Sequence, residues 1–193
     1  MEILWLIAYY VISAGGYYYF SRIPTNNHLL TVWDKYIPTV PIFIVPYLFL
    51  SLAYLFLPII FLFKLECAKV KEYLSAQIIA QFISFAVFYF YSTSVVRDSI
   101  AGSDIFSNAL RYLHSIDRPS AAFPSGHVFQ SIIIGYFLWI WYPKTRPYII
   151  VVLPLVIAST VLLKQHYLPD ILGGIIVAVI AIYLTKILTP KLL

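Results

Sequence analysis

Six long apolar runs constrain this chain more than any other feature of its sequence. They cover residues 3–20, 41–63, 73–96, 125–142, 148–163 and 171–188. A helix needs roughly 20 mostly apolar residues to cross a bilayer, and each run is close to that length. Because 62% of the residues are hydrophobic and only 11% are charged, the chain cannot cover a water-facing surface. We therefore expect an all-α integral membrane protein, in which residues 1–193 form a single domain with a bundle of six transmembrane helices.

The connections between the runs differ in length, and the longest is the most informative. Residues 97–124 join the third run to the fourth, and long ordered loops in compact domains are often functional. Within this loop, residues 107–115 are expected to form a short surface helix. Gln77, Gln81 and Gln130 are polar residues inside the runs, and we expect them to join helices rather than to bind a ligand.

Two short segments beside the apolar runs hold three of the four histidines. The first, residues 111–127, reads RYLHSIDRPSAAFPSGH, and the second, residues 166–170, reads HYLPD. Ionisable side chains gathered at the ends of membrane helices mark a functional site by default. We expect the two segments to meet at one membrane interface and to form an active site there.

The residue types of the first segment are suited to phosphate. Arg111 and Arg118 each present a planar set of donors that matches phosphate oxygens. Ser125 is a natural N-cap, so free backbone N–H groups follow it, and Gly126 lets a ligand approach that backbone. Taken alone, the run of residues 124–127 is explained equally well by a simple helix cap with His127 at a wet interface.

The second segment adds a histidine beside a carboxylate. His166 and Asp170 are four residues apart, and a helix that starts near Pro169 lets Asp170 hold one imidazole nitrogen of His166. The other nitrogen is then free to attack phosphorus or to move a proton. Such a pair alone is more often structural. Together with His127, two arginines and a helix N-terminus, it forms a set for phosphoryl transfer through a phosphohistidine.

This chemistry needs no metal ion and no other cofactor. Mg²⁺ prefers carboxylate ligands, and Asp170 is the only carboxylate close in sequence to the two histidines. A zinc site made by His127, His166 and Asp170 fits the ligand types, but the neighbouring arginines would repel the cation. The net charge of +5 is read as membrane topology and contact with anionic lipid, so we expect membrane lipids as partners and no nucleic acid.

The motifs in combination resemble those of the type-2 phosphatidic acid phosphatase superfamily, which contains membrane lipid phosphatases and phosphotransferases. Its first motif, Lys-x6-Arg-Pro, is similar to the run from Arg111 to Arg118 and Pro119, with arginine in place of lysine. Its second motif, PSGH, is intact at residues 124–127. The resemblance covers residues 104–175, and the expected six helices agree with the fold of the family.

The third motif of that family departs from the pattern at one position. Ser159, His166 and Asp170 match Ser-Arg-x5-His-x3-Asp, but Thr160 stands where the family has arginine. Lys164 follows Thr160 by one helical turn, so we expect it to lie on the same helix face and to replace part of the missing charge at the phosphate site.

The resemblance implies a role for each matched residue. His166 would be the nucleophile, oriented by Asp170, and His127 would be the acid that protonates the leaving group. The phosphoryl oxygens would be held by Arg111, Arg118, Ser125 and Gly126.

The expected function is hydrolysis of a lipid phosphate or diphosphate, such as phosphatidate, phosphatidylglycerol phosphate or polyprenyl diphosphate. Residues 159–174, STVLLKQHYLPDILGG, also resemble the branch that contains inositol phosphorylceramide synthases, which pass a phosphoalcohol headgroup between lipids. The first alternative is therefore a lipid phosphotransferase. The second, suggested by the lost arginine, is a catalytically silent lipid-binding protein.

The basic residues predict the orientation of the bundle. With the N-terminus inside, the cytoplasmic side carries seven Lys and Arg residues and the other side six, or three once Arg111, Arg118 and Lys164 are set aside as site residues. The positive-inside rule then places both termini in the cytoplasm and the site outside, most simply at the plasma membrane. The seven cytoplasmic residues are Lys64, Lys69, Lys71, Lys144, Arg146, Lys186 and Lys191.

Overall fold

The computed structural model describes residues 2–188, and its regular elements are seven α-helices and three short 3-10 helices. The expected all-α class is confirmed. The α-helices are α1 (Glu2–Phe20), α2 (Ile44–Lys64), α3 (Cys67–Phe90), α4 (Ile105–Ile116), α5 (Gly126–Trp141), α6 (Arg146–Leu162) and α7 (Leu168–Leu188). The 3-10 helices are η1 (Trp33–Tyr36), η2 (Pro41–Phe43) and η3 (Pro143–Thr145).

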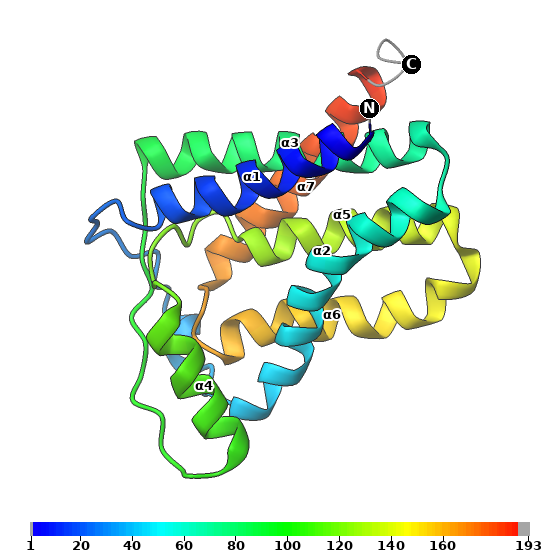
Figure 1. Ribbon diagram of the computed structural model, residues 1–193. Coiled ribbons are helices and arrows are strands. Elements are labelled where there is room, and N and C mark those ends of the chain that lie inside the picture. The colour runs from blue at the N-terminus through cyan, green and yellow to red at the C-terminus, as the bar shows by residue number, and fades with distance from the viewer. Residues whose placement is uncertain (1, 189–193) are drawn as a thin grey trace.

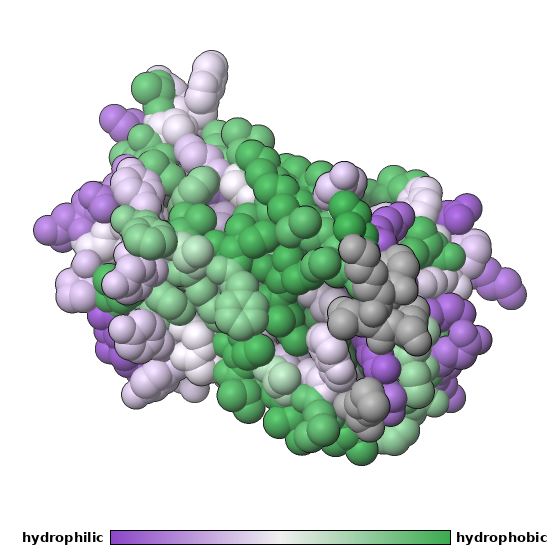
Figure 2. Space-filling view, turned by 90° about the horizontal axis from the view of Figure 1, so that it is seen from above, coloured by the Kyte–Doolittle hydropathy of each residue, from purple (hydrophilic) through white to green (hydrophobic). Residues whose placement is uncertain are grey.

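Five helices are long and apolar enough to cross a membrane, namely α1, α2, α3, α6 and α7, whereas α5 is an apolar helix of only 16 residues. The structure therefore supports an integral membrane protein with five candidate spans, and the expected count of six is not confirmed. Hydrophobic residues cover the middle of the face in Figure 2, and hydrophilic residues gather toward its two ends. Such a band suits a protein surrounded by hydrocarbon.

The third helix lies about one and a half turns earlier than its apolar run predicts. It begins at Cys67 because residues 67–72 form a helical turn that buries Val70, although they carry charges. It ends at Phe90 because residues 92–96 are serine, threonine and valine, which favour helices poorly. These residues bond to other loops instead: Ser94 N–H donates to the carbonyl of Asn27, and Val95 N–H to that of Pro119.

The bundle is built around α3 and α5. α3 packs on α1 and α7, α5 packs on α6 and α7, and α2 packs on α6. The contact between α5 and α7 is very close, because a Cβ atom built on Gly174 would lie 2.8 Å from the main-chain oxygen of Ser125. Glycine thus lets the two helices that carry site residues approach each other.

The two ends of the bundle differ in character. One end holds the turns between α2 and α3 and between α5 and α6 (Figure 1), where Lys64, Lys69, Lys144 and Arg146 lie. The other end holds α4, the long loops and the turn between α6 and α7 (Figure 1). The short helix α4 confirms the expected surface helix, and Asp104 caps it by accepting from the N–H groups that follow. Lys191, which entered the orientation count, lies outside the described residues.

Candidate active site

α5 begins at the predicted helix cap. The Ser125 hydroxyl oxygen accepts a hydrogen bond from the Val128 N–H at 3.4 Å, which confirms the N-cap. The Ser125 N–H donates to the main-chain carbonyl of Asp170 at 3.0 Å. The start of α5 is therefore fastened directly to the start of α7, and the first N–H groups of α5 point toward the same end of the bundle.

The turn between α6 and α7 folds back over the end of α6. The N–H groups of Gln165 and His166 both donate to the carbonyl of Thr160, at 2.9 and 3.1 Å. Lys164 adopts a φ of 54°, a left-handed conformation that sharpens the turn. α7 then begins at Leu168, beside the proline that was expected to mark its start.

Two buried carboxylates complete the N-terminus of α7. Asp170 accepts from the Tyr167 N–H at 2.8 Å, and Asp34 from the distant η1 segment accepts from the Leu168 N–H at 2.8 Å. Asp170 is 0% exposed and Asp34 is 4% exposed. Negative charge at a helix N-terminus is favourable, so both carboxylates help to fix the turn that carries His166.

The three predicted catalytic residues come together. His127 Nδ1 lies 3.3 Å from His166 Nε2, and His166 Nδ1 lies 3.4 Å from Asp170 Oδ2. The latter contact is within ion-pair range but is not aligned as a hydrogen bond. With a proton on Nδ1 facing the carboxylate, Nε2 of His166 keeps its lone pair. Tyr47, which the sequence did not single out, packs its ring 4.6 Å from the His127 ring.

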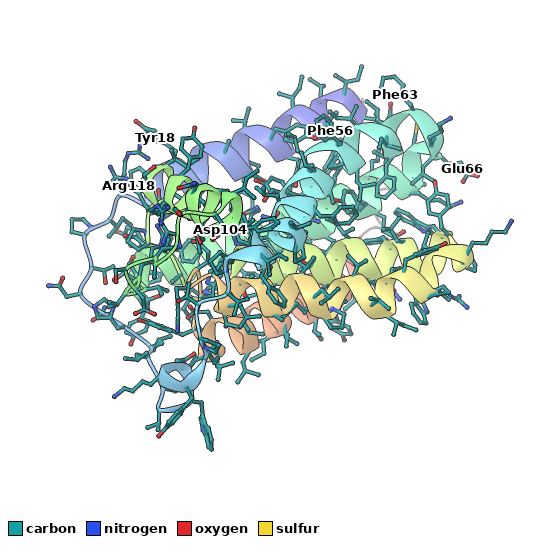
Figure 3. All side chains as sticks on the ribbon, turned by 90° about the horizontal axis from the view of Figure 1, so that it is seen from below. Tyr18, Phe56, Phe63, Glu66, Asp104 and Arg118 are labelled. Carbon is teal, nitrogen blue, oxygen red and sulfur yellow. The ribbon has the colours of Figure 1, made fainter. Side chains whose placement is uncertain are left out.

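The histidines open onto a cavity of about 690 Å³. Its catalytic end is lined by Gly126, His127, His166 and Arg118, and the rest runs between α1 and α2. Tyr18 also lines the cavity, and Figure 3 shows Arg118 and Tyr18 at the same end of the molecule. Within residues 2–188 the Arg118 guanidinium has no hydrogen-bond or ion-pair partner, so it is available to an anion.

Arg111, the other predicted phosphate ligand, lies elsewhere. Its guanidinium donates to the carbonyls of Ile100 and Gly102, at 3.0 and 2.8 Å, and to the side chain of Asn108. It is exposed and does not line the cavity. Of the four residues expected to hold phosphoryl oxygens, Arg118 and Gly126 line the cavity. Ser125 is fully buried as the cap of α5, and Arg111 lies away from the cavity.

The expectation that Lys164 shares a helix face with Thr160 is wrong, because α6 ends at Leu162. Lys164 Nζ donates to the carbonyl of Ile37 at 2.6 Å and lies 3.7 Å from Asp98 Oδ2. It does not line the cavity. The lysine therefore ties the loop before α2 to the turn after α6.

Arg97 is the residue that the sequence analysis missed. Its NH2 group donates to Asp117 Oδ2 at 3.0 Å and to Gln165 Oε1 at 2.7 Å. Its NH1 group donates to the carbonyls of His114 and Asp117, at 3.1 and 2.7 Å. It thus joins the residue before Arg118 to the residue before the nucleophile candidate. The only sequence signal was an arginine directly after an apolar run, at the start of the longest loop.

His114 fastens α4 to the end of α6. Its Nε2 lies 2.9 Å from the carbonyl of Leu163, an acceptor, so this nitrogen carries the proton. Burial lowers the pKa of His114, although the hydrogen bond to Leu163 opposes that shift. A neutral His114 ring can make this contact. His114 does not line the cavity.

The described residues, 2–188, contain no group of three or more His, Cys, Asp or Glu side chains arranged to hold a metal ion. His127, His166 and Asp170, which fit a zinc site by ligand type, lie within this range and do not form such a group. The arrangement instead offers a histidine nitrogen beside a second histidine, an unpaired guanidinium and a helix N-terminus. This set can accept a phosphoryl group and move one proton.

One of the comparisons with known proteins identifies a family for the chain. A family model described as the PAP2 superfamily matches residues 25–184, which include Arg118, His127, His166 and Asp170. No curated protein and no solved structure matches the chain.

Proposed function

Because the chain belongs to the PAP2 superfamily, we propose that it is a membrane lipid phosphatase that works through a phosphohistidine at His166, without a metal ion. Membership supports a phosphatase-type enzyme in general. The finer assignment rests on one observation, the line of contacts from Asp170 through His166 to His127 at the catalytic end of the cavity. The candidate substrates are phosphatidate, phosphatidylglycerol phosphate and polyprenyl diphosphate.

The proposed reaction has two steps. Nε2 of His166 attacks phosphorus, the bond from phosphorus to the lipid oxygen breaks, and His127 gives its proton to that oxygen. Water then attacks phosphorus, the bond from phosphorus to Nε2 of His166 breaks, His127 takes a proton from the water, and inorganic phosphate leaves. Arg118 and the first N–H groups of α5 face the charge that spreads over the phosphoryl oxygens.

Transfer to a second lipid is the alternative. The cavity of about 690 Å³ leaves room beside the histidines for an acceptor alcohol in place of water. The sequence of residues 159–174, which resembles the inositol phosphorylceramide synthase branch, favours the same reading. Both reactions use the same first step and differ only in what attacks the phosphohistidine.

A lipid panel tests the proposal. The protein in detergent is given each candidate lipid with excess EDTA, and inorganic phosphate is measured together with label from the headgroup on added diacylglycerol or ceramide. We expect phosphate release that EDTA does not reduce, and an acid-labile phosphoryl-protein on quenching. Loss of activity with EDTA, restored by Zn²⁺ or Mg²⁺, contradicts the metal-free mechanism. Label on an acceptor lipid identifies the phosphotransferase, and turnover of no lipid favours a silent lipid-binding protein.

We also propose that the site faces away from the cytoplasm of the cell, at the plasma membrane. Ser103 is exposed near α4, at the end of the bundle that carries the site, while Cys67 is exposed at the other end. A Ser103→Cys change in a Cys67→Ser background is expected to react with an impermeant thiol reagent in whole cells. Reaction only after lysis reverses the orientation.

A further inference from the structure

A tyrosine hydroxyl at the catalytic end of the cavity has no partner in the described part of the protein. Tyr47 on α2 is 3% exposed, lines the cavity and packs its ring 4.6 Å from that of His127. Among residues 2–188 its hydroxyl has no hydrogen-bond partner. The hydroxyl is accessible from the cavity, so a ligand that covers it must offer it a hydrogen bond or leave it unpaired, which is costly.

At the far end of the same cavity, two tyrosine hydroxyls have a structural role instead. Pro58 in α2 has no N–H to give to the carbonyl of Tyr54, four residues earlier. Tyr9 on α1 donates its hydroxyl to that carbonyl at 3.4 Å, and Tyr10 donates to the carbonyl of Leu55. These two hydroxyls therefore tie α1 to the part of α2 that precedes Pro58.

Two further groups near Tyr47 share its lack of a partner. Tyr54 follows Tyr47 by two helical turns on the same face of α2, and Gln130 follows His127 by one turn on α5. Both line the cavity, and within the described part of the chain neither side chain donates or accepts a hydrogen bond. Gln130 was expected to join helices, as Gln81 does through its contact of 3.1 Å with Ser13, but it faces the cavity instead.

We infer that this cavity binds the alcohol part of the lipid, and that Tyr47 and Gln130 select an alcohol carrying a further hydroxyl or amide group close to the phosphate. The inference rests on the proposed function. The lipid oxygen that leaves must lie beside His127 to take its proton. The phosphoryl oxygens lie toward Arg118 and the start of α5, so the rest of the alcohol extends past Tyr47.

The chemistry of the lining decides what kind of alcohol fits. A bare hydrocarbon chain in this place would remove water from Tyr47, Tyr54 and Gln130 and offer them no partner. A hydroxyl or an amide near the phosphate can bond to these groups, while the tyrosine rings cover the apolar carbons around it. A site built around such hydrogen bonds discriminates strongly against the analogue that lacks the polar group.

The test compares two substrates that differ by one hydroxyl. 1-Acylglycerol 3-phosphate carries a free hydroxyl next to the phosphate-bearing carbon, and the corresponding acylpropanediol phosphate lacks only that hydroxyl. Both are presented at the same mole fraction in detergent micelles, and kcat/KM is measured for each. We expect the wild-type protein to favour the hydroxyl-bearing lipid by about tenfold or more.

Substitutions then locate the preference. Tyr47→Phe and Gln130→Leu are each expected to bring the ratio of the two kcat/KM values down toward one. Tyr183→Phe is the matched control, because Tyr183 is 65% exposed on α7 and does not line the cavity. It is expected to keep the wild-type ratio. Circular dichroism and the melting temperature report whether each variant is folded.

The outcomes separate this inference from the proposed function. Turnover of both lipids at equal kcat/KM by the wild-type protein overturns the selection and leaves the phosphatase standing. A preference that survives both Tyr47→Phe and Gln130→Leu overturns the assignment of these residues. Failure to turn over any lipid phosphate overturns the proposed function, and the inference falls with it.

Discussion

The histidines and the arginines of the site are held in place by different means. The histidine region is fixed at helix ends. Ser125 bonds to the main chain of Asp170 and His166 to that of Thr160, and the carboxylates of Asp170 and Asp34 hold the start of α7. The arginine region, residues 97–118, is fixed by one side chain. Arg97 reaches four acceptors in two separate segments, the end of α4 and the turn between α6 and α7.

Because of this difference, the geometry of the two regions is not equally predictable from the sequence. A helix cap and a pair spaced four residues apart are local geometry, so the sequence of a few neighbouring residues determines them. The contact between Arg97 and Gln165 joins residues 68 positions apart. No pattern in the loop that holds Arg97 indicates its partner.

Removing the nucleophile candidate is the strongest test of the histidine region. His166→Ala is expected to lower kcat/KM by at least about 10³-fold, because His166 is the cavity histidine whose ring faces a carboxylate, that of Asp170. The measurement is phosphate release by protein that keeps its melting temperature in detergent. Activity that stays within about tenfold of wild type would contradict the phosphohistidine.

The second prediction separates the arginines from one another. Arg97→Met is expected to lower kcat by about 10²-fold, the loss typical of a small misplacement of reacting groups, with a smaller change in KM. Arg111→Met, the matched control, is expected to change kcat by less than about threefold, because Arg111 bonds only to its own loop and helix.

A double-mutant cycle shows whether Arg97 acts through its partner. If Arg97 positions the turn that carries His166, Gln165→Leu adds little to the loss already caused by Arg97→Met. Arg97→Lys keeps the charge but cannot reach all four acceptors, so it is expected to rescue only part of kcat. Equal losses for Arg97→Met and Arg111→Met would mean that Arg111 reaches the site when lipid binds.

Much of the fold and half of the site could be predicted from the sequence. The apolar runs gave the helices, and local spacing gave the Ser125 cap and the start of α7. The end of α3 at Phe90 was missed because residues 91–96 are apolar enough for a span but bond to distant loops. Lys164 was misplaced because a helical face was extended two residues past Leu162, where the backbone turns left-handed.

The third prediction compares two glycines within the histidine region. A methyl group on Gly126 would meet only the Phe129 ring, at 3.8 Å, whereas one on Gly174 would lie 2.8 Å from the Ser125 main-chain oxygen. Gly174→Ala is therefore expected to lower the melting temperature, because overpacking costs about 1–3 kcal/mol. Gly126→Ala is expected to fold normally and to lower kcat/KM by about tenfold, because its methyl group blocks the approach of phosphate to α5. Equal melting temperatures for the two variants would contradict the close contact of α5 with α7.

The smallest expected effect belongs to Lys164. Its ammonium group bonds to the carbonyl of Ile37 and pairs with Asp98, away from the cavity. Lys164→Met is therefore expected to change kcat by less than about threefold, while it lowers the melting temperature by loosening the loop before α2. The matched control is Asp98→Asn, which removes the partner charge and should lower the melting temperature less, because Asp98 is mostly exposed. A fall in kcat of about 10²-fold or more in Lys164→Met, with no fall for Asp98→Asn, would instead show that the lysine turns into the site and supplies the charge that Thr160 lacks.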